Sequence, residues 1–223
     1  MTARAIAAGV LALAVLAAPA ARAQTVRFDV GATPAFEVLA GSGFDDAVAP
    51  LELRGAVALA VEDRPLVIGV SLTSPLLEPG IDDFVFETFA EYDLHEDFGW
   101  TVRPRLSLAV PTTSNEVFSA TGLDVGVGLF GGWSDPIWTL GAEVVGHLGV
   151  LSHLRASEWG REYGSLASDA ILAGNGYRLE VGARAGLLLG PVEIALRAGW
   201  RRRGDYSESP PVYAMLSVGV RWQ

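Results

Sequence analysis

The three histidines are the residues of this chain best suited to act as a general base. His147 follows Glu143 by four residues in a strand-like run, and four residues of strand span about 13 Å, so the two side chains cannot bond directly. His95 lies in an expected turn, where it is solvated. Ser152 and His153 are adjacent, so on a strand they point to opposite faces. Because a general base must reach its nucleophile through a hydrogen bond, we predict no catalytic residue and no enzymatic activity.

Metal-binding and covalent chemistry also have few candidates in the sequence. The chain has no Cys, and its 16 basic residues are all Arg. These absences exclude a disulfide scaffold, a Cys-ligated zinc site, a thiol nucleophile and a lysine Schiff base. The carboxylate pairs Asp45-Asp46 and Asp82-Asp83 lie in expected loops and suit Ca²⁺, although such pairs are more often simply solvated. We therefore predict no metal and no cofactor.

Many of the charged residues fall on one face of runs in which polar and apolar residues alternate. That face carries nine acids and nine bases, and His147 lies on it as well. The acids are Asp29, Glu52, Glu87, Glu91, Asp93, Asp124, Glu143, Glu180 and Glu193, and the bases are Arg27, Arg54, Arg103, Arg105, Arg178, Arg184, Arg197, Arg201 and Arg221. Charges removed from water must be paired or hydrated, and Arg offers fork-shaped contacts to carboxylates. Equal numbers of acids and bases on one face predict a network of ion pairs across an interior.

The elements that must position these charges are β-strands, because the alternation has a period of two. Ten runs show it, the first being the shortest: 26–30, 51–61, 66–72, 84–94, 100–110, 123–129, 138–150, 177–189, 192–200 and 212–222. Pro104 removes one ladder donor in mid-strand. No amphipathic helix of convincing length is present, and residues 163–173 offer at most a helical turn within a loop.

Short and long connections alternate along the chain. The short ones are 62–65, 95–98, 131–136 and 190–191, and the longer ones are 33–49, 73–83, 111–118, 153–175 and 203–211. An up-and-down meander that keeps all short turns at one end has this order. We therefore predict an all-β, up-and-down antiparallel transmembrane β-barrel of ten strands, with eight or twelve strands as alternatives.

Aromatic residues on the apolar face cluster at the two ends of the expected strands. Those near the short turns are Tyr92, Trp100, Trp138 and Trp222, and those near the longer connections are Phe84, Tyr177 and Trp200. Two such aromatic belts are typical of a barrel that crosses a bilayer, where strands of about 10 residues suffice. The alternation alone also allows a soluble barrel with an apolar core.

The first 23 residues have the three parts of a secretory signal peptide. A short basic start precedes an apolar run, and Ala21-Arg22-Ala23 places small residues before the cut at Gln24. Residues 24–223 then form the barrel. The formal net charge of -10 argues against a nucleic-acid partner, and the acidic excess lies in the expected connections. Acidic rims disfavour anionic solutes and favour cations, neutral solutes or cation-bridged lipid headgroups.

The C-terminal run resembles the last strand of bacterial outer-membrane β-barrel proteins. It reads LSVGVRWQ, and its aromatic residue, Trp222, is penultimate, whereas that family usually ends on the aromatic residue itself. The resemblance covers architecture, and no specific subfamily emerges from it. It implies a Gram-negative cell outer membrane location, contact with lipopolysaccharide, and insertion by the outer-membrane assembly machinery through this strand.

Strand number bears on what such a barrel does. Eight-stranded barrels are filled by side chains and sixteen-stranded ones hold a channel, so a ten-stranded lumen is narrow or occluded. We predict a structural role or a porin-like, narrow transport of small solutes. The alternatives are a surface-binding or adhesion barrel acting through its external loops, of which 153–175 is the longest, a barrel-embedded enzyme acting on lipid or peptide, and a soluble secreted ligand-binding barrel.

Overall fold

The computed structural model is built almost entirely from β-strands, as the period-two pattern predicts. It describes residues 34–45, 49–76, 83–97, 99–134, 137–164, 169–174, 176–204 and 211–222. The expected signal peptide and the expected strand at 26–30 lie outside these ranges. Within them, no helix has the length and apolar composition needed to span a bilayer.

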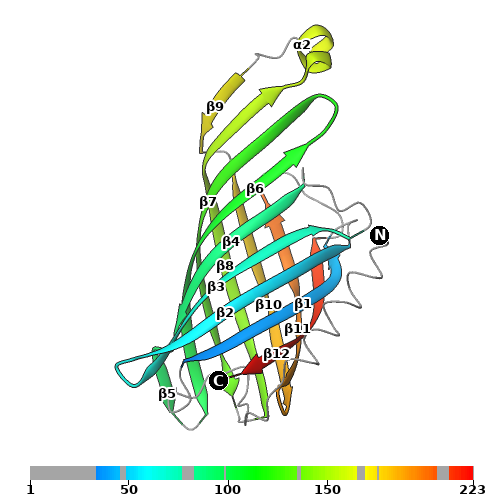
Figure 1. The fold of residues 1–223 in the computed structure, drawn as a ribbon. Coiled ribbons are helices and arrows are strands. Elements are labelled where there is room, and N and C mark those ends of the chain that lie inside the picture. Colours follow the sequence, from blue (N-terminus) through cyan, green and yellow to red (C-terminus); the bar gives the residue numbers. More distant parts are fainter. Residues whose placement is uncertain are drawn as a thin grey trace.

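Ten of the described strands form a closed barrel (Figure 1). They are β1 (Ala35–Asp45), β2 (Pro50–Val61), β3 (Arg64–Pro75), β4 (Phe84–Tyr92), β6 (Trp100–Ser114), β7 (Phe118–Ser134), β8 (Trp138–Ala156), β10 (Tyr177–Leu189), β11 (Val192–Arg203) and β12 (Val212–Trp222). Each barrel strand pairs antiparallel with the next along the chain, and β12 returns to pair with β1 from Phe36–Trp222 to Asp45–Tyr213. The predicted fold, an up-and-down antiparallel barrel of ten strands, is confirmed.

The inner face of the barrel is polar and its outer face is apolar. Leu106 and Val127 keep 64% and 58% of their surface exposed on the outside. Glu193 and Arg221, in contrast, retain only 0% and 1% on the inside. Because successive side chains of a strand point to opposite faces, the sequence alternation produces this separation directly. Among the described residues the fully enclosed apolar core is small, and Ala35 and Ala58 form its centre.

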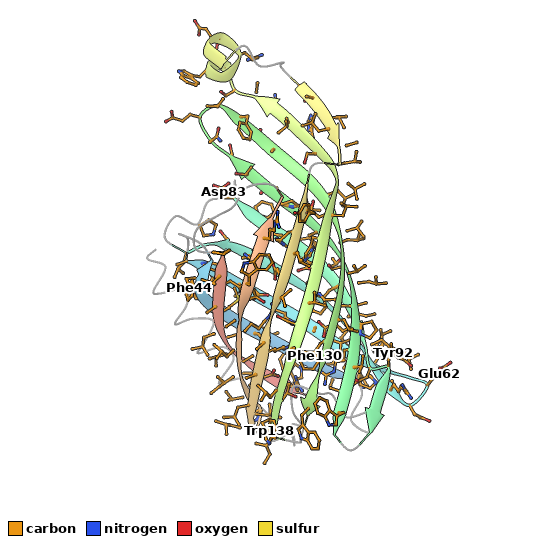
Figure 2. The ribbon with its side chains drawn as sticks, turned by 180° about the vertical axis from the view of Figure 1, so that it is seen from behind. Phe44, Glu62, Asp83, Tyr92, Phe130 and Trp138 are labelled. Carbon is orange, nitrogen blue, oxygen red and sulfur yellow. The ribbon has the colours of Figure 1, made fainter. Side chains whose placement is uncertain are left out.

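The short turns lie together at one end of the barrel, which we call the short-turn end. Glu62 and Asp63, between β2 and β3, have φ values of 51° and 58°. Positive φ at both central residues is what a two-residue type I′ hairpin requires. Figure 2 shows Glu62, Tyr92 and Trp138 toward this end, and Phe44 and Asp83 toward the other, which we call the extended end.

Three barrel strands continue beyond the barrel at the extended end. The edge of β8 pairs first with β10, through residues 138–148, and then with β9 (Asp169–Ala173), through residues 151–155. A short helix, α2 (Glu158–Gly164), connects β8 to β9. Together with the ends of β6 and β7, these elements form a sheet that projects from the barrel (Figure 1). We call the part of it between residues 150 and 175 the extension.

The first barrel strand is not the one that the sequence pattern suggests. The segment 33–49, expected to be a long loop, contains β1. Its outward residues Phe36, Val38 and Phe44 do alternate, but Gly41 and Gly43 weaken the pattern. These glycines have a packing reason, since a Cβ at Gly43 would lie 2.7 Å from the Cα of Met215 in β12.

Two other expected loops are also largely regular structure. The connection 111–118 is a tight hairpin between β6 and β7, in which Asn115 Oδ1 accepts the backbone N–H groups of Val117 and Phe118 at 2.8 and 2.9 Å. The segment 153–175 holds the end of β8, helix α2 and β9, so the helical turn begins earlier than the expected 163–173. The expected turn at 131–136 includes the last residues of β7, which runs to Ser134.

Pro104 interrupts one ladder without ending its strand. The pairing of β4 with β6 stops at Glu91–Arg105, and β5 (His95–Asp97) resumes it at His95–Val102. The other edge of Pro104 still pairs with Leu129 of β7. Since proline has no amide hydrogen to donate, the break falls where that donor is missing.

Candidate functional site in the barrel lumen

Arg221 of β12 lies between two carboxylates inside the short-turn half of the barrel. Its Nη2 donates to Glu37 Oε2 at 2.7 Å and to Glu193 Oε2 at 2.6 Å. The Nε of Arg54 lies 3.6 Å from the other oxygen of Glu37. All four side chains are buried. Two guanidinium groups therefore offset two carboxylates where water is excluded, which is the arrangement that makes buried charge tolerable.

A second polar cluster lies beside the first. Arg103 Nε is 3.5 Å from Asp93 Oδ2, and its Nη2 donates to Ser134 Oγ at 3.2 Å. Thr101 donates a hydrogen bond to Asp93. The hydroxyl groups of Ser134 and Thr139 share a hydrogen bond of 2.6 Å, which links β7 to β8. The cluster thus joins the inner faces of β6, β7 and β8.

The inner face of β4 combines two acids with an aromatic ring. Arg105 reaches Glu87 Oε1 at 2.9 Å and Glu91 Oε1 at 3.1 Å. Phe89 stands between these acids, and the guanidinium carbons of Arg54 and Arg105 lie 4.4 and 4.5 Å from its ring centroid. Desolvated cation–π contacts of this kind add to the ion pairs.

These clusters leave almost no free space in the short-turn half of the lumen. The cavity between them measures about 10 Å³, which is room for about one water molecule. Its charged lining consists of Glu37, Arg54, Glu91, Asp93, Arg103 and Arg184. Within the described structure the lumen is therefore closed at this level by side chains. We call these six charged residues, together with Glu193 and Arg221, the plug.

The extended half of the lumen holds a larger cavity of about 120 Å³, which we call the mouth cavity. Arg201 and Arg178 both approach Glu180 Oε1 through their Nε atoms, at 2.8 and 3.2 Å. The Nε of Arg197 donates to Glu143 Oε1 at 2.8 Å. All three arginines line the cavity and keep 15–22% of their side-chain surface exposed.

Two neutral polar groups in the lining of this cavity lack partners. The hydroxyl of Tyr213 and Nδ1 of His147 are buried and make no hydrogen bond with any described residue. The guanidinium of Arg201 lies over the Tyr213 ring, 5.0 Å from its centroid. Gly126, which pairs with His147 across β7 and β8, makes room for the imidazole, because a Cβ there would lie 2.8 Å from Nδ1.

The remaining predicted lumen residues are also on the inner face. Glu52 lines the mouth cavity and forms no ion pair with a described side chain. Arg184 is buried in the plug, and Asp124 is half-buried at the rim, where the β7–β8 register shifts. Arg27 and Asp29 lie outside the described residues. The alternation thus identifies the inner face but not which charges meet.

The predicted aromatic residues are arranged around the outer face near the two barrel ends. Trp100, Trp138, Tyr177 and Trp200 are exposed, and Phe84, Tyr92 and Trp222 are half-buried. The ring of Trp222 stacks on Phe36 with 6.0 Å between centroids. The hydroxyl of Tyr92 donates to the carbonyl of Val61 at 3.4 Å.

Glu37, Phe89 and Tyr213 are among the inner-face residues that the sequence reasoning does not identify. Glu37 is missed because its strand looked like a loop, although Phe36 and Val38 alternate with it. Phe89 and Tyr213 are aromatic residues on the polar side, where they support guanidinium groups. The sequence signal for both is their spacing, since each stands in phase with inward charges: Phe89 between Glu87 and Glu91, and Tyr213 eight residues before Arg221.

The catalytic and metal candidates remain dispersed. His153 pairs with Asp169 across β8 and β9, and both are exposed, whereas the neighbouring Ser152 is buried on the opposite face. Asp83 accepts the backbone N–H of Ser114 at 3.1 Å. Its neighbour Asp82 and the other pair's Asp46 lie outside the described residues. Within the described ranges no three His, Asp or Glu side chains converge as a metal site.

No protein-family model matches this chain, and no curated protein sequence matches it.

Proposed function

We propose that this protein is a barrel of the bacterial outer membrane with a structural role, whose lumen is closed to free flow and open as a cavity at one end. The observation that carries the proposal is the inverted polarity of the barrel. Apolar side chains such as Leu106, Val127 and Leu140 cover its outside, whereas its inside holds ion pairs. In water, an outer face of this kind is unfavourable, because apolar surface is excluded from water.

Two further features support a bilayer around the barrel. The aromatic residues Trp100 and Trp138 lie at the short-turn end and Tyr177 and Trp200 at the extended end, where amphipathic rings favour a membrane interface. The closed ring of strands pairs the backbone groups of every barrel strand with a neighbour, which a lipid environment demands.

Among functions open to such a barrel, the plug favours a structural or ligand-holding role over an open channel. The cavity inside the plug has about 10 Å³ of free space, room for about one water molecule, so a hydrated ion does not fit there. Narrow transport of a small solute would require the ion pairs of Arg221 and Arg103 to separate. Separating them costs several kcal/mol for each charge that is left buried without a partner.

The proposed partners follow from the location. Lipopolysaccharide and other outer-membrane lipids would contact the apolar face. The assembly machinery would receive β12, whose last residues pair with β1 in the finished barrel.

A membrane test comes first. We expect the protein, expressed with its N-terminal segment, to fractionate with outer membranes and to resist extraction by carbonate. In detergent it should migrate faster on gels before boiling than after. A folded, monomeric protein in plain buffer would contradict the proposal and favour the soluble barrel.

A second candidate function is surface binding through the extension. The observation in its favour is that the extension exposes apolar side chains beyond the barrel: Trp159, Ile171 and Leu172, with Ile171 75% exposed. If this surface binds another cell component, whole cells that carry the protein should adhere to a surface coated with that component. The triple substitution of these residues by Ser should abolish adhesion while gel mobility stays unchanged.

A further inference from the structure

We propose that the mouth cavity binds a small zwitterion of about amino-acid size, with a carboxylate at one end and an ammonium group at the other. This inference goes beyond the location and structural role of the barrel, because the cavity lies inside the ring of strands whatever surrounds it.

The lining of the cavity has separated charge. Three of its arginines, Arg178, Arg197 and Arg201, come from β10 and β11, together with Glu180 of β10. Its other carboxylates, Glu52 and Glu87, come from β2 and β4, and Arg105 of β6 lies beside Glu87. In the ring order β10-β11-β12-β1-β2-β3-β4-β6-β7-β8, the strands β2 to β4 lie across the lumen from β10 and β11. One wall therefore carries three guanidinium groups with one acid, and the opposite wall carries two acids with one guanidinium group, so the excess charge of the two walls is opposite in sign.

The arginine wall has hydrogen-bonding capacity left for a ligand carboxylate. Arg178 and Arg197 each pair with a protein carboxylate through Nε. Among the described residues, Glu180 and Glu143 are the acids with which these two arginines form ion pairs. Terminal guanidinium nitrogens present a planar fork that matches a carboxylate. The unpartnered hydroxyl of Tyr213, which lines the same cavity, supplies a further donor.

The acidic wall has the complementary capacity for an ammonium group. Glu87 is already bound to Arg105 at 2.9 Å, whereas Glu52 has no described ion-pair partner. Buried polar groups are normally hydrogen-bonded, so the unsatisfied Nδ1 of His147 in this lining is a second sign of a missing polar occupant. The cavity of about 120 Å³ is roughly ten times the space that one water molecule needs.

The small volume of the cavity excludes large occupants, and its charged lining disfavours apolar ones. Simple ions also fit it poorly. A simple anion would leave Glu52 unpaired, and a simple cation would leave the arginine forks unused. A zwitterion satisfies both walls at once, and its own net charge of zero leaves the balance of the lumen unchanged.

The test uses three matched probes and the full barrel in detergent. L-Alanine carries both charged groups, propionate lacks the ammonium group, and ethylamine lacks the carboxylate. By calorimetric titration we expect saturable binding of L-alanine in the millimolar range or tighter, and binding of each truncated probe weaker by about tenfold or more, since each loses charge-assisted hydrogen bonds. No saturable binding at ~50 mM alanine, well above a millimolar Kd, would overturn the proposal. Propionate binding as tightly as alanine would also overturn it, in favour of an anion site.

Two substitutions test the carboxylate-binding and the ammonium-binding groups separately, and neither removes an ion pair that stabilises the barrel. Tyr213→Phe removes only a hydroxyl with no described partner, and Glu52→Gln removes only a charge with no described ion pair. Each should weaken alanine binding, by about 2–10-fold for the hydroxyl and by about tenfold or more for the charge. Glu52→Gln should not weaken propionate binding, because it removes a negative charge that repels the anion.

Matched control substitutions lie outside the cavity. Tyr92→Phe, at the short-turn end, and Glu158→Gln, in α2, should leave alanine binding as it is. Gel mobility before boiling verifies that every variant is folded. Folded Tyr213→Phe and Glu52→Gln variants that bind alanine as tightly as the unsubstituted protein would contradict the proposal.

Discussion

At the scale of single residues, Arg221 holds two buried acids of the interior, a role that no sequence motif indicates. One of its nitrogens bridges Glu37 and Glu193, and both acids are buried. Removing the guanidinium leaves two carboxylates without their main counter-charge. We therefore expect Arg221→Met to lower the free energy of unfolding by about 3–5 kcal/mol, the range for a buried charge that loses its partner. Urea titration of the refolded barrel, followed by tryptophan fluorescence, measures this change.

Arg202→Met provides the control, because Arg202 is exposed near the end of β11. It should change the same free energy by less than about 0.5 kcal/mol. If the two substitutions have equal effects, the plug does not stabilise the barrel in the way proposed. Combining Arg221→Met with Glu37→Gln and Glu193→Gln should recover part of the lost stability, because no unpaired charge then remains.

At the scale of elements, the extension is separable from the barrel. Gly149 donates its backbone N–H to the carbonyl of Gly176 at 2.9 Å, so β8 and β10 are already adjacent where the extension leaves them. Replacing residues 150–175 with Asn-Gly makes a two-residue hairpin there. We expect the shortened protein to keep its heat-dependent shift in gel mobility. Loss of that shift would show that β9 and α2 are needed to close the barrel.

The sequence predicts the position of a strand where its outward residues are apolar and alternate with polar ones. It does not predict the strand ends where both faces are polar. Leu123, Val125, Val127 and Leu129 alternate clearly within β7. The hairpin of β6 and β7 continues through Thr112, Thr113 and Ser114, where both faces are polar and the alternation disappears. β1 was missed for a related reason, since Gly41 and Gly43 are required by close contact with β12.

The lumen residues could be predicted as a face but not as pairs. Inward charges recur at every second residue of a strand, so the alternation within β4 alone identifies Glu87 and Glu91. Pairing depends on register and on position around the ring, as in Glu37 and Arg221, which are 184 residues apart in the chain. The division into a plug and a mouth cavity depends on the same information, together with side-chain volumes such as that of Phe89.

At the scale of the whole molecule, substitutions on the outer face test whether lipid or water surrounds the barrel. Leu106 is 64% exposed in the middle of β6. In a bilayer, Leu106→Arg should lower the free energy of unfolding by about 2–4 kcal/mol if the residue lies near the midplane. Ile171→Arg is the matched control, because Ile171 is 75% exposed on the extension, where we expect a change below about 0.5 kcal/mol. Unfolding in phospholipid vesicles measures both, and a neutral Leu106→Arg would contradict the membrane location.

The plug also has a consequence for the whole barrel that electrical recording can measure. Since the cavity inside the plug has about 10 Å³ of free space, we expect the protein in a planar bilayer to show no steady ion current. A reproducible single-channel conductance from folded protein would contradict the closed lumen and favour the transport function. Incorporation is verified separately by protease protection of the reconstituted vesicles.

The pairing of β12 with β1 favours a ring of ten strands over a smaller one, because β12 supplies the cation for acids on two other strands. Glu37 comes from the first barrel strand and Glu193 from the ninth, and their shared cation, Arg221, is near the end of the tenth. A ring that closed prematurely around nine strands would bury both acids without that cation, at a cost of about 3–5 kcal/mol. Correct closure thus pairs the backbone edge of β1 and supplies the interior charge together, whereas an undersized ring leaves both acids without Arg221.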